Sequence, residues 1–261
     1  QSAACRTRNA WTFWVFPRKK RDLPSARTVN LTGEQRLDKR YEATAERSLE
    51  GVSLVLANRV TAGLLEYVRN GGTAILLDDD AERAAVARPG VWHESQRPAP
   101  RSQVLRRPGF LPYWPYWLRC DVQVVEQHPA LGDFPHAGTS GVQFMRLYGN
   151  GVASIQLTAD RGAARQKVQP LVWGLSLAPW SADPTPYGLA LTWHTVIGEA
   201  RLERGRLLIC NLYVLDGIRA ERPEAGYLLD CLVQHALSAN SATALPPFTV
   251  DEVRQLLKID E

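Results

Sequence analysis

The sequence predicts an α/β fold, with a mainly parallel central sheet and helices flanking it. Two observations lead to this prediction. The almost wholly apolar strand within GVSLVLANRV (51–60) is followed by the helix TAGLLEYVRN (61–70) and the strand TAILL (73–77). Strand, helix and strand in so few residues form a βαβ unit, whose strands run parallel. The strand GRLLICNLYV (205–214) and the helix PEAGYLLDCLVQHALS (223–238) repeat this alternation near the end of the chain.

The first elements are short. Residues 9–17, NAWTFWVFP, alternate as a strand does and are apolar on both faces, so we expect this segment to lie across another layer. Its face carrying Trp11, Trp14 and Phe16 is expected to meet a neighbouring domain or subunit. A short strand is expected at 28–32.

The helix of the βαβ unit has a clear start and stop. Thr61 precedes it, and the pair Gly71–Gly72 ends it in the manner of a C-terminal glycine cap. Leu64, Leu65 and Val68 fall on one helical face. Because the glycine pair lies between a helix and the next strand, it is in the wrong order for a phosphate-binding loop.

A β-rich insertion is expected from about residue 88 to 200. It opens with a Pro- and Arg-rich stretch (88–117) that ends in FLPYWPYW, typical of a functional loop or a subunit contact. A short strand or helix is expected within 121–131. Further strands are expected at 151–157, 167–177 and 188–202.

The chain divides into an α/β domain over 1–240, which contains this insertion, and a linker with a short helix over 241–261. The helix at 223–238 has Pro223 in its first turn and an apolar stripe. Thr249 and Glu252 have the spacing of a capping box, which predicts the start of the terminal helix.

The composition is that of a soluble globular protein: 261 residues, 45% hydrophobic, 22% charged and a net charge of +4. No apolar run is long enough to cross a membrane. The basic cluster PRKKR (17–21) has no nucleic-acid-reading motif beside it, so neither a membrane nor a nucleic acid is expected as partner. Cys210 and Cys231 fall in an apolar strand and an apolar helix, which predicts small buried side chains; the compartment stays open.

Motifs for common chemistries are missing. The sequence has no GxGxxG, no GxxxxGK[ST] and no GxSxG, so no cofactor is expected and the serine-hydrolase elbow is absent. His128, Asp133 and His136 are the candidate metal ligands, but the prolines between them and their irregular spacing favour a role in capping loops.

Carboxylates and tryptophans remain as candidates. Asp78, Asp79 and Asp80 follow a parallel strand, where ligands of open α/β sheets gather, but three aspartates can also simply end a strand and cap the next helix. Glu126 and Glu199 are the other candidate acids, and for Glu199 the alternative is a charge at the edge of a hairpin. Trp114, Trp117 and Trp180 are candidates for stacking on sugar rings, or for burial at an interface.

Four segments together resemble the C-terminal region of bacterial family 2 glycoside hydrolases, the β-galactosidase and β-glucuronidase kind. They are NAWTFWVFP, LLEYVRNGGTAILL, HPALGDFPH and IGEARLERGRLLICNLYVLD with RPEAGYLLDCLVQHAL, and the resemblance covers most of residues 9–240. It implies a class I glutamine-amidotransferase-like, flavodoxin-like three-layer sandwich. A related domain in family 42 β-galactosidases serves in trimer formation.

The resemblance also implies where a nucleophile would lie. An active amidotransferase would have a cysteine directly after the strand TAILL, and this sequence has Asp78 there. The catalytic acids of family 2 enzymes belong to a separate barrel domain, so no catalytic residue is carried over. The expected function is therefore that of a non-catalytic accessory domain of a carbohydrate-active enzyme, for domain packing, oligomerisation or sugar contact. The alternatives are a glycosidase-type hydrolase with a carboxylate pair, and a free-standing carbohydrate-binding module.

Overall fold

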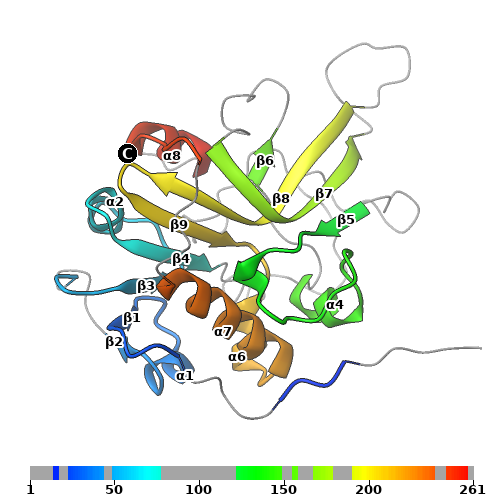
Figure 1. Ribbon diagram of the computed structural model, residues 1–261, viewed down its shortest axis with the longest axis horizontal. Coiled ribbons are helices and arrows are strands. Elements are labelled where there is room, and N and C mark those ends of the chain that lie inside the picture. Colours follow the sequence, from blue (N-terminus) through cyan, green and yellow to red (C-terminus); the bar gives the residue numbers. More distant parts are fainter. Residues whose placement is uncertain are drawn as a thin grey trace, which may run out of the picture.

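The computed structural model of the chain describes residues 14–17, 23–43, 49–77, 122–148, 155–157, 167–178, 190–238 and 245–257. These residues form one mixed sheet with helices on both faces, so the predicted α/β class is confirmed (Figure 1). In order across the sheet, the strands are β2 (Glu42–Ala43), β1 (Thr28–Asn30), β3 (Leu54–Ala57), β4 (Thr73–Leu77), β9 (Gly205–Cys210), β8 (Ala190–Leu202), β7 (Val168–Ala178) and β5 (Val122–Val125), and β6 (Ile155–Leu157) pairs with β8.

The sheet has a parallel part and an antiparallel part. The parallel part consists of five neighbouring strands, in the order β2, β1, β3, β4 and β9. It includes the β3–β4 pair of the predicted βαβ unit. Strands β8, β7, β5 and β6 are joined by antiparallel pairs. These four strands lie mainly in the expected β-rich insertion, which therefore extends the central sheet beside β9 rather than forming a sheet of its own.

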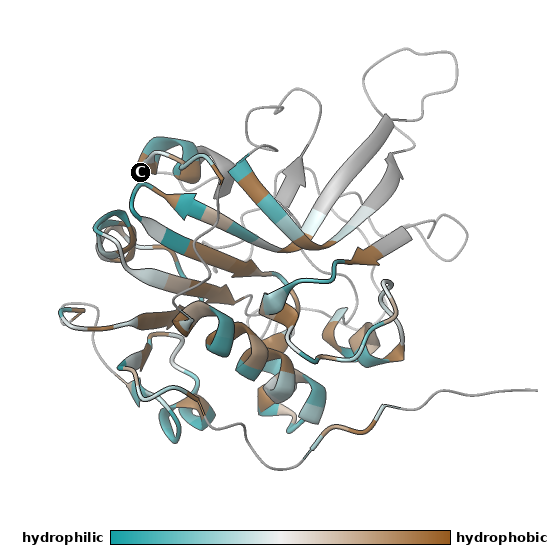
Figure 2. Cartoon of the chain, viewed as in Figure 1, coloured by the Kyte–Doolittle hydropathy of each residue, from teal (hydrophilic) through white to brown (hydrophobic). Residues whose placement is uncertain are grey.

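Both faces of the parallel part are buried, because successive side chains of a strand point to opposite faces. On β9, Leu208 and Cys210 join one core, and Leu207 and Ile209 join the other. Figure 2 shows hydrophobic residues along β3, β4 and β9. The first core, here the α7-side core, is covered by α1 (Gln35–Asp38), α4 (Val142–Tyr148), α6 (Val214–Arg219) and α7 (Pro223–Leu237), and the second, the α2-side core, by α2 (Ala62–Arg69) and α8 (Val250–Leu257).

The predicted helix ends are confirmed by hydrogen bonds. The hydroxyl of Thr61 accepts from the backbone N–H of Leu64, and Gly71, with φ of +109°, follows the C-cap of α2. At α8, the carboxylate of Glu252 accepts from the backbone N–H of Thr249, whose own hydroxyl accepts from the N–H of Glu252, as a capping box requires.

The first described segment, 14–17, departs from expectation in one respect. Phe16 packs on the chain's own core, with ring centroids 5.6 Å from Phe134 and 5.5 Å from Tyr227, although its face was expected to point away from the chain. Trp14 is 39% exposed and Val15 is 92% exposed. Trp11 lies outside the described residues.

Three short helices, α1, α4 and α6, were not expected from the sequence. Cys210 and Cys231 are both buried in the α7-side core, as predicted. Within the described ranges, no helix combines the length and apolar character that a membrane crossing needs.

Candidate functional site

Open α/β sheets bind ligands at the carboxyl edge of their parallel strands. Strand β4 ends at Leu77, and Asp78, Asp79 and Asp80 lie outside the described residues. Trp114, Trp117 and Trp180 also lie outside them.

Three asparagines occupy this edge, at the ends of β1, β3 and β9. The amide of Asn30 donates to the carbonyl of Glu34 and to Asp38, and that of Asn58 donates to the carbonyl of Thr32. These two side chains hold the loops that leave the sheet. Asn211 is fully buried, and in the described part of the chain neither polar atom of its amide has a hydrogen-bond partner.

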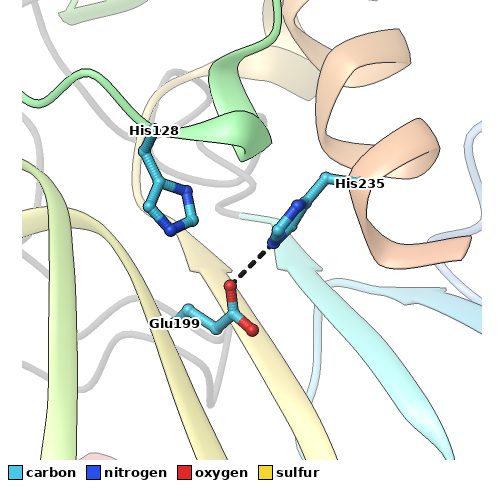
Figure 3. A group of neighbouring side chains, drawn as sticks. All are labelled: His128, Glu199 and His235. Atoms are coloured by element: carbon cyan, nitrogen blue, oxygen red, sulfur yellow. Dashed lines mark hydrogen bonds and ion pairs between the residues drawn. The ribbon is translucent and has the colours of Figure 1, made fainter. Parts of the chain in front are cut away.

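A cluster of charged and titratable side chains lies at the opposite, amino edge. Figure 3 shows His128, Glu199 and His235 turned toward one another from the loop after β5, from β8 and from α7. Arg206, the second residue of β9, completes the group, which we call the His–Glu cluster. Arg206 pairs in register with Thr73, the first residue of β4, which places the cluster at the amino ends of the parallel strands.

Glu199 is the centre of the cluster, and it is 1% exposed. Its Oε1 accepts from Nε of Arg206 at 3.0 Å, and its Oε2 lies 2.8 Å from Nε2 of His235. Burial by itself raises the pKa of this carboxyl, but the hydrogen bond with His235 and the charge of Arg206 outweigh burial and hold the pKa below its ordinary value. Glu199 is therefore ionised at neutral pH, and because a carboxylate can only accept, Nε2 of His235 is the donor.

This burial corrects the sequence interpretation of Glu199. A charge at the edge of a hairpin was expected, but β8 is an interior strand between β7 and β9. Arg206 on the adjacent strand β9 bonds to one carboxylate oxygen of Glu199, and His235 on α7 bonds to the other. Both partners of this carboxylate therefore come from inside the fold.

His128 is half-buried. It precedes the 3-10 turn η3 (Pro129–Leu131), and its Nδ1 accepts from the backbone N–H of Ala130 at 3.2 Å. Its ring packs edge-on against His235, with centroids 5.3 Å apart. Burial and the neighbouring His235 lower the pKa of His128, although the charge of Glu199 opposes them.

Glu126 is half-buried and acts electrostatically on His128 of the cluster. Its Oε1 accepts from the indole N–H of Trp173 at 2.7 Å, and its charge also acts to raise the pKa of His128. Glu126 and Glu199, two of the candidate acids, thus both act on the imidazole of His128. Glu126 is half-buried, whereas Glu199 is closed off from solvent.

Two of the candidate metal ligands, His128 and His136, have the loop-capping role that the sequence favoured. His128 and His136 each use Nδ1 to accept a backbone N–H, from Ala130 and Gly138, and so both cap turns. Among the described residues, the one group with metal-ligand spacing is His128, Glu199 and His235, whose ligand atoms lie within 4.8 Å of one another.

This group fits a metal ion poorly. A ligating histidine normally donates its second ring N–H to an acceptor, but the second nitrogen of His128 faces the N–H donor of Ala130. The guanidinium of Arg206 also bonds to Glu199 and would repel a divalent cation. The chemistry of the donors therefore favours a hydrogen-bonded cluster over a metal site.

We expect Zn²⁺ or Co²⁺ to leave the melting temperature of the chelator-treated protein unchanged, because an ion held by the folded state would raise it. Differential scanning fluorimetry with and without the ion provides the measurement. A rise that disappears in His128→Asn would contradict this expectation.

His235 and Arg206 were missed as site residues. The sequence did contain a signal for Arg206. Glu199 in EARL and Arg206 in RLLIC are opposite charges in two consecutive apolar strands, and charges buried in this way are normally paired with each other. His235 carries no such local signal, because only the packing of α7 brings it to Glu199.

Comparisons with known proteins add no relative: no protein-family model matches the chain, and no curated protein matches it.

Proposed function

We propose that the chain is a non-catalytic accessory domain of a carbohydrate-active enzyme, amidotransferase-like and flavodoxin-like in fold, used for domain packing, oligomerisation or sugar contact. The parallel β3–α2–β4 unit and the helices on both faces of the sheet are compatible with such a fold. The residue after β4 is Asp78 rather than a cysteine. Cys210, at the end of β9, is wholly buried and so unavailable as a nucleophile.

The state of Glu199 carries this proposal. A glycosidase needs one carboxyl whose raised pKa lets it act as general acid, and a second carboxylate facing the same cleft. The pKa of Glu199 is lowered instead, and both of its oxygens are bonded inside the protein. Such a carboxylate stabilises the packing of α7 on the sheet, and at 1% exposure it is closed off from a substrate.

An exposed apolar surface supports the packing role. Trp14 and Val15 are exposed on the first described segment, and Val142 (72% exposed) and Met145 (66%) on α4. The two segments flank the same ring, because Phe134 lies 5.6 Å from Phe16 and 5.0 Å from Phe144 between ring centroids. Large side chains exposed in this way are typical of surfaces that meet another protein or domain.

The proposal is tested by hydrolysis of a chromogenic glycoside panel and by glycan-array binding with the same purified protein. We expect no hydrolysis above the buffer blank. Binding without hydrolysis would identify sugar contact as the role, and silence in both assays would favour packing or assembly.

The comparison of Glu126→Gln with Glu50→Gln makes this test specific. Glu126 is the half-buried acid beside His128, whereas Glu50 is exposed in the loop before β3. Hydrolysis that is lost in Glu126→Gln but kept in Glu50→Gln would overturn the accessory role and make the chain a hydrolase.

A further inference from the structure

The segment from His128 to His136 is held at both ends by the same kind of hydrogen bond. Nδ1 of His128 accepts the N–H of Ala130 at 3.2 Å, and Nδ1 of His136 accepts the N–H of Gly138 at 3.3 Å. An imidazole nitrogen accepts only when the ring is neutral, because both nitrogens of a protonated ring are donors. When the histidine takes up a proton, this hydrogen bond is therefore lost, because the ring N–H then faces the backbone N–H that it had accepted.

Between the two histidines, the segment inserts its largest apolar side chain into the core. Phe134 is 2% exposed and packs against Phe16, Phe144 and Tyr227, with ring centroids 5.0 to 6.3 Å apart. We call these four rings the aromatic cluster. The segment thus joins the first described segment, α4 and α7 through one phenylalanine.

We infer that His128 and His136 form a pH-sensitive latch, which fastens the segment between them on α7 at neutral pH and releases it in acid. This property goes beyond the proposed accessory role and does not depend on it. Its consequence is that acid loosens the aromatic cluster, including the docking of Phe16 and the exposed residues beside it.

The charges around His128 favour the neutral ring. His235 from α7 and Arg206 from β9 oppose its protonation, whereas Glu199 from β8 and Glu126 from the end of β5 favour it. Burial is the largest influence, and the net result is a pKa below the ordinary value.

His136 behaves in the same way for a simpler reason. Burial is the cause that lowers its pKa. The neighbouring α4 contributes a neutral contact, in which the side-chain amide of Gln143 donates to the carbonyl of Pro135.

The direction of the pH effect follows from these lowered values. In the released segment the two histidines have their ordinary pKa of about 6.5, whereas in the bound segment their pKa values are lower. As the pH falls through about 6.5, protons therefore bind to the released form first, and this binding favours release. Two protons bound on opening increase the opening equilibrium constant by up to about 100-fold per pH unit, and one proton by about 10-fold.

Amide hydrogen exchange followed by NMR tests the latch at about pH 7.5 and about pH 5.5, on either side of the ordinary histidine value. After correction for the intrinsic pH dependence of exchange, we expect the protection of Ala130 and Gly138 to fall in acid. The amides of β4 serve as the internal reference and should keep theirs.

Asparagine is the matched replacement at both positions, because its side-chain oxygen also accepts the N–H two residues on but does not titrate. In the double variant His128→Asn/His136→Asn we expect the loss of protection in acid to disappear. If this variant does not fold, the two single variants provide the test. In each of them we expect the opening equilibrium constant to change by about 10-fold per pH unit at most, the value for one bound proton.

Two results would overturn the latch. One is unchanged protection of Ala130 and Gly138 between the two pH values in the original chain. The other is an equal loss of protection in the asparagine variants, which would place the titrating group elsewhere.

Discussion

Gly205→Ala is expected to cost about 3 kcal/mol of unfolding free energy or more, at the upper end of what overpacking usually costs. Gly205 begins β9 where the strand meets the end of α2, and an added Cβ would overlap the carbonyl oxygens of Val68 and Gly72. Both oxygens belong to backbone, and that of Gly72 accepts the N–H of Arg206 at 3.0 Å. Relief therefore requires moving the C-terminal turn of α2 or the β4–β9 pairing.

Urea denaturation monitored by circular dichroism measures this cost, and Gly226→Ala is the control. Gly226 lies within α7, and a Cβ there would meet no atom within 4 Å. This variant is expected to be neutral or to gain about 0.5–1 kcal/mol, because alanine has the better helix propensity. A Gly205→Ala protein as stable as Gly226→Ala would show that the two backbones do not approach so closely.

Glu199→Gln is expected to destabilise the fold by about 3–5 kcal/mol, the usual cost of removing one partner of a buried ion pair. The loss leaves Arg206 without its carboxylate, and one amide group cannot serve both Arg206 and His235 as acceptor. The pKa of Glu199 is lowered in the folded state, so its contribution is present above its ordinary value of 4.5 and is lost as the pH falls through the lower folded value.

Chemical denaturation at neutral and acid pH checks both parts of this prediction. Glu66→Gln removes the exposed pair of Glu66 with Arg69 and should cost at most about 1 kcal/mol. The double variant Glu199→Leu/Arg206→Met should recover much of the loss, because it leaves neither charge of that pair buried alone. If Glu199→Gln lowers the free energy of unfolding no more than Glu66→Gln does, the prediction is wrong. Such a result would mean that water reaches the cluster and screens its charges as it does at an exposed pair.

The elements predicted best are those with a local signal at each end. Helix α2 lies between the cap Thr61 and Gly71, α8 begins at the Thr249–Glu252 box, and α7 has Pro223 at its first position. Strand β4 has the predicted bounds because the glycine pair and the first aspartate delimit an apolar run. Capping and turn preferences act within a few residues, so they can be read without the fold.

The short helices escaped prediction because their local signals are weak. Helix α6 has no side-chain cap, and α1 is only four residues long. Neither offers enough residues for a helical period to stand out, and their stability comes from tertiary contacts. One such contact is the ion pair of Glu34, which caps α1, with Arg219 of α6.

The sequence named several residues of the cluster as candidates, but it did not reveal which of them lie together. His128 and His136 cap turns, which is the role that the sequence favoured over metal binding. Asp133 and His136 do not join the cluster of His128, whose partners come from β8, β9 and α7. These partners are 71 to 107 residues away along the chain (199 − 128 = 71 and 235 − 128 = 107), so no spacing rule could have found them.

By itself, the sequence determined the α/β class, the parallel β3–β4 pair and the ends of the longer helices, because apolar periodicity and capping are local properties of the chain. Only the tertiary structure decided the charge state of Glu199 and the neighbours of His128. A pKa depends on which charges and hydrogen bonds surround a group and on how deeply it is buried. Here the packing of α7 on β8 and β9 sets these surroundings.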